Sequence, residues 1–179
     1  MNVTVNKSVA SGKVSAPPSK SMAHRLLIAA AMSRGKSIVR NVSFSEDIKA
    51  TLSCLEALGV DTSVEQDTVV LRSNGFSLRD GTLFCNESGS TLRFFVPIAL
   101  TLGERVTFTG SERLLSRPLD EYERLCRERG FGFEKNENSL SVCGSLEGGR
   151  YTLSGNVSSQ YITGLIFGLA ALGEESVIK

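Results

Sequence analysis

Hydrophobic residues along the chain follow two periods, one typical of helices and one typical of strands. Three stretches, 25–32, 92–102 and 161–172, are apolar nearly all round a helical turn, which is typical of helices in a protein interior. The stretch 47–58 places its apolar residues on one helical face, and 118–129 opens with the Pro and acids of a first helical turn, so both predict outer helices. Alternating or strand-like segments predict strands at residues 37–42, 61–65, 68–72, 105–109, 131–135, 139–142 and 151–154.

These predicted elements recur in the same order along the chain. The glycine that closes the first buried helix is Gly35, and its counterparts in the next two copies are Gly103 and Gly173. Repeats of such a period usually indicate solenoids or propellers, but a unit of helix, strand, helix and two strands fits neither architecture. The pattern therefore predicts a pseudo-threefold α/β domain.

A serine-rich turn precedes each of the three apolar helices, at 19–21 (SKS), 87–90 (ESGS) and 158–160 (SSQ). The start of a helix offers unpaired N–H groups and a positive dipole end, and both attract anions. For one such turn, simple N-capping is the more common explanation. Three turns in register favour a ligand with several negative groups, bound where the helix starts meet.

Cationic side chains lie beside these turns. Lys20 is in the first turn and Arg25 follows it at the start of the helix, so both can approach one anion, although a solvated surface pair is the alternative. Arg117 directly precedes a proline at a predicted helix start and can also face the ligand. Arg93 lies within an apolar helix, where an ion pair or hydrogen bonds to loop carbonyls explain it equally well. His24 has no companion typical of a nucleophile and base pair.

Composition and charge narrow the class of protein. The net charge is +1 and 41% of the residues are hydrophobic, which is a globular composition and argues against a nucleic-acid surface. No stretch approaches the roughly 18 apolar residues of a membrane span, and no apolar signal-peptide core opens the chain. We therefore expect a cytoplasmic protein without membrane or nucleic-acid partners.

The four cysteines are scattered without C-x-x-C spacing, and the chain has one histidine. This pattern predicts no metal site and favours free thiols in a reducing compartment over disulfides. The cysteines are Cys54, Cys85, Cys126 and Cys143.

Four motifs, taken together and in their order along the chain, resemble the N-terminal half of the 3-phosphoshikimate 1-carboxyvinyltransferases, the EPSP synthase family. They are 18–25 (PSKSMAHR), 86–93 (NESGSTLR), 116–118 (SRP) and 157–161 (VSSQY). The resemblance covers nearly the whole chain. It implies an α/β fold, an inside-out α/β barrel (EPT/RTPC-like) of repeated βαβαββ units, which agrees with the repeat above.

The resemblance also implies residues that bind the first substrate, shikimate 3-phosphate. Ser21 and Arg25 map to positions that meet this substrate, chiefly at its carboxylate. Ser158 and Ser159 map to positions that bind its phosphate.

For the second substrate, phosphoenolpyruvate, the resemblance implies contacts from Gly89 and Arg117, while Lys20 and Gln160 lie near both substrates. The implied reaction adds the shikimate 5-hydroxyl to C2 of phosphoenolpyruvate and then expels phosphate, with no cofactor and no metal ion. Lys20 is the best candidate for handling a proton. Gly89 also lies where glyphosate, the inhibitor of this family, binds.

On this resemblance, residues 12–85 form a first unit, 86–150 a second, and 151–179 the start of a third, while the C-terminal domain that supplies acid and base residues is missing after Lys179. We therefore expect the isolated chain not to turn over and to self-associate through surfaces meant for the missing part. Residues 1–11 are also expected to lack partners.

One departure and two alternatives remain. The family often has Asn-Ala-Gly-Thr where this chain has residues 87–90, so the Glu87 carboxylate must be turned away or paired. The first alternative is the related UDP-N-acetylglucosamine enolpyruvyl transferase, whose members carry Lys-Asn at the first turn and a reactive loop cysteine, whereas Cys126 falls in a predicted helix. The second is a noncatalytic anion-binding module.

Overall fold

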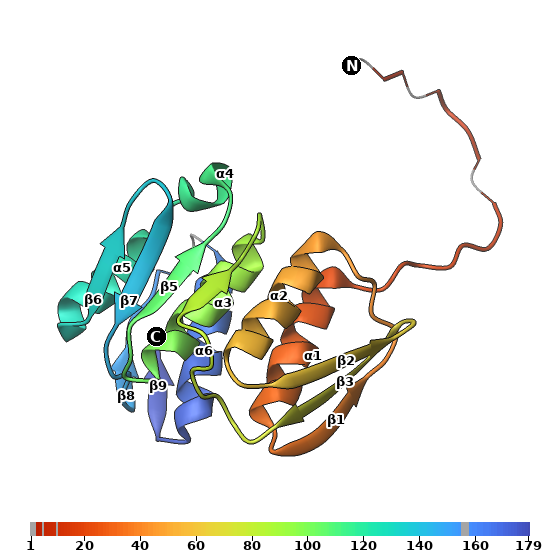
Figure 1. Cartoon of the computed structure of the whole chain (residues 1–179). Helices are drawn as coiled ribbons and strands as arrows, with labels where there is room; N and C mark the ends of the chain where they lie inside the picture. The colour runs from red at the N-terminus through yellow and green to blue at the C-terminus, as the bar shows by residue number, and fades with distance from the viewer. Residues whose placement is uncertain (1–2, 5, 10, 155–157) are drawn as a thin grey trace.

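The structure, a computed structural model, describes residues 3–4, 6–9, 11–154 and 158–179 (Figure 1). Its helices are α1 (Lys20–Met32), α2 (Glu46–Ala57), α3 (Gly89–Leu100), α4 (Glu112–Leu115), α5 (Asp120–Arg129) and α6 (Ser159–Leu172). Its strands are β1 (Gly35–Val39), β2 (Asp61–Glu65), β3 (Thr68–Ser73), β4 (Thr82–Phe84), β5 (Val106–Thr109), β6 (Gly132–Lys135), β7 (Ser139–Cys143), β8 (Gly149–Tyr151) and β9 (Ser176–Ile178). Every element predicted from the pattern overlaps one of these, and α4, β4 and β9 are additional.

The described residues form three sheets whose topology repeats. In the first sheet β3 lies between β1 and β2, and in the second β7 lies between β5 and β6, all antiparallel. The second sheet adds β4, which runs parallel to β5, and the third consists of the parallel pair β8 and β9. Within the described ranges no strand occupies the matching edge of β1.

Helices α3 and α6 pack unusually closely, side by side (Figure 1). A Cβ atom at Gly168 would lie 2.9 Å from the carbonyl oxygen of Pro97, and one at Gly164 would collide with the backbone of Arg93 and the hydroxyl of Tyr122. Glycine at both positions therefore lets the two helix backbones approach.

The three apolar helices are buried to different degrees. α3 is buried along almost its whole length, as its sequence predicts. α1 leaves Met22 and Leu26 exposed, and α6 leaves Ile166 exposed, because no element in the described part of the chain covers those faces. The expectation that all three helices are interior therefore holds fully only for α3.

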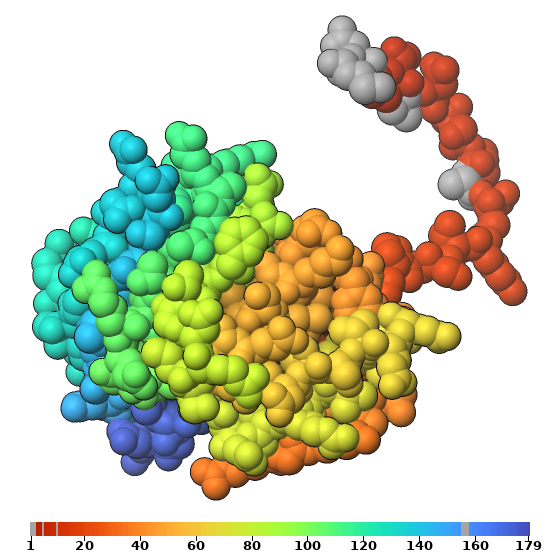
Figure 2. Space-filling model, viewed as in Figure 1, coloured from red at the N-terminus to blue at the C-terminus, as the bar shows by residue number. Residues whose placement is uncertain are grey.

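The outer helix α2 exposes a polar stripe and buries its other side against α1, α3 and β4. The described residues before α1 are exposed from 3 to 17 and run away from the body (Figure 2). Residues 1–2, 5 and 10 of the N-terminal segment, and residues 155–157 of the predicted third unit, lie outside the described residues. Val157 of the fourth motif is among them.

Candidate functional site

Serine caps the N-terminus of each of the helices α1, α3 and α6. Ser19 Oγ accepts the Met22 N–H at 3.3 Å. Ser88 Oγ accepts the Thr91 N–H at 3.2 Å, and Ser158 Oγ accepts the Gln160 N–H at 3.3 Å. The capping interpretation is thus confirmed for these serines, and the other first-turn N–H groups remain available to a ligand.

The starts of α3 and α6 are joined by Gln160. Its Nε2 donates to Ser90 Oγ at 2.8 Å, and its Oε1 accepts from an Arg93 guanidinium nitrogen at 3.1 Å. Arg93 also donates to the carbonyl of Pro118 at 3.3 Å. The loop-carbonyl explanation for Arg93 is therefore correct, and the same guanidinium also orients Gln160, which the sequence did not indicate.

Two guanidinium groups meet at the first residue of α3. A Cβ atom at Gly89 would lie 2.6 Å from a guanidinium nitrogen of Arg117 and 2.9 Å from one of Arg93. Among the residues that the structure describes, neither arginine has a carboxylate within ion-pair distance. Like charges so close together at the positive end of a helix are stabilised by an anion.

Short local contacts place Arg117 at this position. α4 is capped by Ser111, whose Oγ accepts the Leu114 N–H at 3.1 Å, and the chain turns at Pro118 into α5. The ammonium group of Lys135 on β6 donates to the carbonyl of Arg117 at 2.9 Å. The Ser111 cap and the Lys135 bond therefore hold the turn, and the Arg117 guanidinium projects from it over the start of α3.

At the start of α1, Lys20 is paired with an acid that the sequence analysis missed. Lys20 Nζ lies 2.6 Å from Asp47 Oδ2 in the first turn of α2, and both side chains are partly exposed. Asp47 belongs to a different helix, so spacing along the chain gave no signal for this contact. The pair keeps the ammonium group at the helix start.

Arg25 connects α1 to α3 and α6. One guanidinium nitrogen donates to the carbonyl of Ser21 at 2.9 Å and another to Thr163 Oγ1 at 3.4 Å. The guanidinium carbon also lies 5.2 Å from the ring centre of Phe94. Arg25 is thus fixed at the point where the three helix starts approach one another.

The remaining predicted site residues lie at the same helix starts. Ser21 is exposed in the first turn of α1, and Ser159 is exposed as the first residue of α6, next to the cap Ser158. Glu87 is exposed directly before the cap of α3. The structure thus places the predicted residues of α1, α3 and α6 near three linked helix starts, and Arg117 reaches the start of α3 from the turn before α5.

His24 is buried beside this region. Burial lowers the pKa of His24 from 6.5 to about 4, while nearby Asp47 raises the pKa and Lys20 and Arg25 lower it. The imidazole is therefore neutral at physiological pH.

Three of the four thiols are buried. Burial raises the pKa of Cys126, on α5, to about 12, and Cys54 and Cys85 are also buried. Cys143 is partly exposed. A buried helical Cys126 does not fit the reactive loop cysteine expected of the UDP-N-acetylglucosamine enolpyruvyl transferases.

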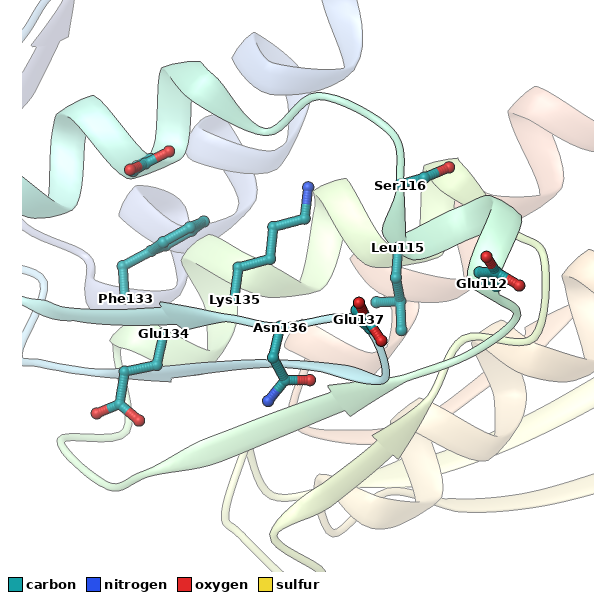
Figure 3. Close-up of a pocket in the computed structure, with 9 residues that line it drawn as sticks. Glu112, Leu115, Ser116, Phe133, Glu134, Lys135, Asn136 and Glu137 are labelled. Atoms are coloured by element: carbon teal, nitrogen blue, oxygen red, sulfur yellow. The ribbon is translucent and has the colours of Figure 1, made fainter.

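A hollow of about 850 Å³ lies between α4, α5 and β6 (Figure 3). Glu112, Glu123 and Glu137 are among its lining residues, with Lys135 as its cation, whereas the Glu134 carboxylate is paired with Arg105. Figure 3 shows the Lys135 side chain on the same side of β6 as Phe133, with Glu134 on the opposite side. This acidic lining suits a phosphorylated ligand less well than the helix starts do.

Two features are absent from the described part of the chain. No helix there is long and apolar enough to cross a membrane. Within the same residues, no group of three or more His, Cys, Asp or Glu side chains is arranged to hold a metal ion.

Comparisons with known proteins place the chain in a family. A family model described as EPSP synthase (3-phosphoshikimate 1-carboxyvinyltransferase) matches residues 5–179. A protein named 3-phosphoshikimate 1-carboxyvinyltransferase from Clostridium perfringens is 43% identical, over 98% of this chain and 42% of that protein. One of the same name from Clostridium novyi is 41% identical, over 99% of this chain and 43% of that protein. The chain therefore spans less than half the length of these curated relatives.

A solved structure supports the fold. An EPSP synthase from Acinetobacter baumannii superposes with a TM-score of 0.74 at 23% identity, over 88% of this chain and 37% of that one. The fold class predicted from the sequence, the α/β fold of the EPT/RTPC-like inside-out barrels, is confirmed.

Proposed function

Because the chain belongs to the EPSP synthase family, we propose that it forms part of a 3-phosphoshikimate 1-carboxyvinyltransferase. The enzyme transfers the enolpyruvyl group of phosphoenolpyruvate to the 5-hydroxyl of shikimate 3-phosphate, releasing phosphate. The product, 5-enolpyruvylshikimate 3-phosphate, leads to chorismate and the aromatic amino acids. The observation that carries this proposal is the convergence of Arg93 and Arg117 on Gly89 without a carboxylate partner in the described residues.

In this proposal the start of α3 holds phosphoenolpyruvate. Arg117 and the first-turn N–H groups of α3, at Gly89, meet its negative groups, and Gln160 donates from the side, oriented by Arg93. Fixed donors of this kind stabilise the charge that moves onto the departing phosphate.

Shikimate 3-phosphate is proposed to lie against α1 and α6. Arg25 and Ser21 bind its carboxylate, and the helix start at Ser158 and Ser159 binds its phosphate. Holding two mutually repelling anions together in a productive orientation is a large part of the catalysis.

Lys20 is proposed to move a proton in the addition step, between the attacking hydroxyl and C3 of phosphoenolpyruvate. Its ammonium group is held by Asp47 at the edge of the site. The acid and base groups that complete the reaction are proposed to come from a C-terminal half, so the 179-residue chain by itself is expected not to turn over.

We further propose the unit boundaries 12–85, 86–150 and 151–179. β4, at the end of the first unit, pairs with β5 of the second. The four free thiols support a reducing compartment such as the cytoplasm.

Two assays test the proposed function. In the complete gene product that carries this sequence, Arg117→Ala is expected to raise the KM for phosphoenolpyruvate at least about tenfold, because the substitution removes one charge-assisted contact. Arg113→Ala is the matched control, since Arg113 is exposed in the same short helix α4. No release of phosphate that depends on shikimate 3-phosphate in the unmodified protein would refute the proposal.

Titration of the isolated chain separates an enzyme half from a general anion-binding module. Amide signals near Ser21, Arg25 and Ser158 are expected to shift with shikimate 3-phosphate and not with shikimate plus inorganic phosphate, and Lys20→Ala is expected to weaken the response. Equal responses to both would favour the anion-binding module.

A further inference from the structure

A row of hydrogen-bonded polar side chains crosses the apolar interior between α1, α2 and α3. His24 Nδ1 lies 2.7 Å from Thr51 Oγ1, which lies 2.8 Å from Thr91 Oγ1. Thr91 Oγ1 in turn lies 2.7 Å from Ser88 Oγ. Each of these four side chains is at most 1% exposed. The row has no part in the substrate contacts proposed above.

The hydroxyl groups determine a proton order in the row, that is, which group donates and which accepts in each hydrogen bond. Each hydroxyl has one proton to donate. When Thr91 donates to Ser88, it must accept from Thr51, and Thr51 must then accept from His24. The His24 proton is thereby assigned to Nδ1. Nε2 is left as a bare lone pair, and it is a buried atom without a hydrogen-bond partner among the described residues.

The far end of the row is the start of α3. Ser88 is the cap of this helix, and Gly89, beneath the two guanidinium groups, is the next residue. Thr91 Oγ1 is also 3.5 Å from the carbonyl oxygen of Asp47, whose carboxylate holds Lys20. The row therefore lies between the Lys20–Asp47 pair and the Gly89 backbone.

Buried polar groups are costly in an apolar interior unless they are bonded to one another. Aliphatic side chains would fill the same space without that cost. A polar row that ends at a ligand-binding helix start is instead suited to setting the direction of the cap hydroxyl.

We propose that His24 is a positioning residue, which acts through Thr51 and Thr91 to orient the Ser88 cap and to fix the start of α3 relative to the Lys20–Asp47 pair. The kinetic consequence of this inference rests on the proposed function, whereas its structural consequence does not. The role requires a proton on Nδ1. The charged groups that act on the imidazole are Lys20 and Arg25 from α1 and Asp47 from α2, and burial keeps its pKa low.

The first test needs no substrate. His24 is the single histidine of the chain, so its imidazole ¹⁵N signals are assigned without ambiguity. Between pH 6 and 8 we expect the neutral tautomer with the proton on Nδ1. A neutral ring with its proton on Nε2 would overturn the proton order and with it the proposal.

The second test uses variants of the complete gene product. The amide nitrogen of Asn stands as many bonds from the backbone as His Nδ1, so His24→Asn keeps the donor, whereas His24→Leu and Thr51→Val break the row. We expect the breaking variants to shift the Gly89 and Ser90 amide signals without ligand. We also expect them to raise the KM for phosphoenolpyruvate about tenfold with a smaller change in kcat. His24→Asn is expected to restore both readouts to within about twofold of the unmodified protein.

The matched control is Thr107→Val, which removes a partly buried hydroxyl pair with Ser141 at 2.9 Å, within the sheet and away from the helix starts. It is expected to change neither readout. Unchanged Gly89 signals in His24→Leu would overturn the proposal whether or not the protein is a transferase. Shifted and restored Gly89 signals in a protein without transferase activity would support the positioning role and refute only the proposed function.

Discussion

The guanidinium group of Arg117 occupies the space that a side chain at Gly89 would need, with a nitrogen 2.6 Å from the position of the missing Cβ atom. Gly89 is the first residue of α3, and its φ lies outside the left-handed region, so its backbone does not require glycine. What requires glycine here is the approach of the arginine, which brings a cation directly over the first-turn N–H groups.

Replacement of Gly89 by Ala is therefore expected to displace the guanidinium groups of Arg117 and Arg93 while the fold persists. In the complete gene product we expect the KM for phosphoenolpyruvate to rise about tenfold or more, the size of one weakened charge-assisted contact. Steady-state kinetics measures this. Gly81→Ala is the control, because a Cβ there would meet its nearest neighbour at an ordinary 3.9 Å. Equal kinetics in the two variants would contradict the expectation.

The Tyr122 hydroxyl is a buried contact between α5, α3 and α6, at 2.7 Å from the Arg93 carbonyl oxygen and 3.0 Å from that of Tyr161. Tyr122→Phe removes the one hydroxyl proton that these carbonyls share, and we expect a loss of about 1–3 kcal/mol in the free energy of unfolding. Urea unfolding followed by circular dichroism measures the loss. Tyr151→Phe removes a bond to the Glu147 carbonyl at a partly buried hydroxyl and is expected to cost less. A larger loss for Tyr151→Phe than for Tyr122→Phe would contradict the deeper burial of the Tyr122 hydroxyl.

The stability of the chain is expected to fall as the pH falls from about 6.5 toward 4. In that window unfolded His24 takes up a proton, whereas folded His24, with its pKa near 4, does not, so protons favour the unfolded state. The difference in pKa between the folded and unfolded states corresponds to a loss of at most roughly 3 kcal/mol in the free energy of unfolding. Above pH 6.5 both states are neutral and the effect is absent.

Unfolding measured at pH 7.5 and pH 5 in the unmodified chain and in His24→Asn isolates this contribution, since the carboxylates titrate alike in both. The variant is expected to lose less stability between the two pH values. An identical loss in both proteins would show that His24 is already charged or exposed in the folded state.

Thiol labelling is expected to distinguish the cysteines. Cys54, Cys85 and Cys126 are buried, and burial raises the pKa of the Cys85 and Cys126 thiols. Cys143, at the end of β7, is partly exposed and is expected to react first with an aromatic disulfide reagent in the folded chain. Mass spectrometry identifies the labelled residue, and Cys143→Ser is expected to abolish the fast phase. Fast labelling of Cys126 would restore the case for a reactive-cysteine transferase.

The isolated chain is expected to self-associate with rising concentration. The edge of β1 carries no strand within the described ranges, and Ile38 on β1 is 43% exposed. Ile38→Lys places a charge on this edge and is expected to shift the equilibrium toward monomer in sedimentation measurements. Val177→Lys, on the exposed side of β9, is the comparison for a general solubility effect. A monomer at all concentrations would contradict the expectation.

Periodicity along the chain was enough to predict the main helices and the repeat, because those elements bury apolar faces whose spacing is local. It missed β4, which has only three residues, too few to show an alternation. The Ser-rich turns indicated the helix starts correctly, because a cap bond joins residues close in sequence. The roles of the substrate-binding residues stay predictions.

The contacts that assemble the site were not predictable in this way. Asp47 binds Lys20 from another helix, and Thr51 connects His24 to Thr91 across two helices. Arg93 looked structural because it sits in an apolar helix, yet its bond to Gln160 joins α3 to α6. Each contact joins residues far apart in sequence, and only the packing of the helices brings them together.

The glycine contacts between α3 and α6 also have a mechanical consequence. With Gly164 and Gly168 seated against the backbone of α3, and the Tyr122 hydroxyl contacting both helices, α3 and α6 form one closely packed body that carries Gly89 and Gln160. α1, with Lys20 and Arg25, is joined to this body mainly by side chains, including the Arg25–Thr163 bond at 3.4 Å. A ligand that binds both parts is therefore expected to clamp α1 against the α3–α6 pair, and the angle of α1 is expected to differ more between the free and bound protein than the packing of α3 on α6.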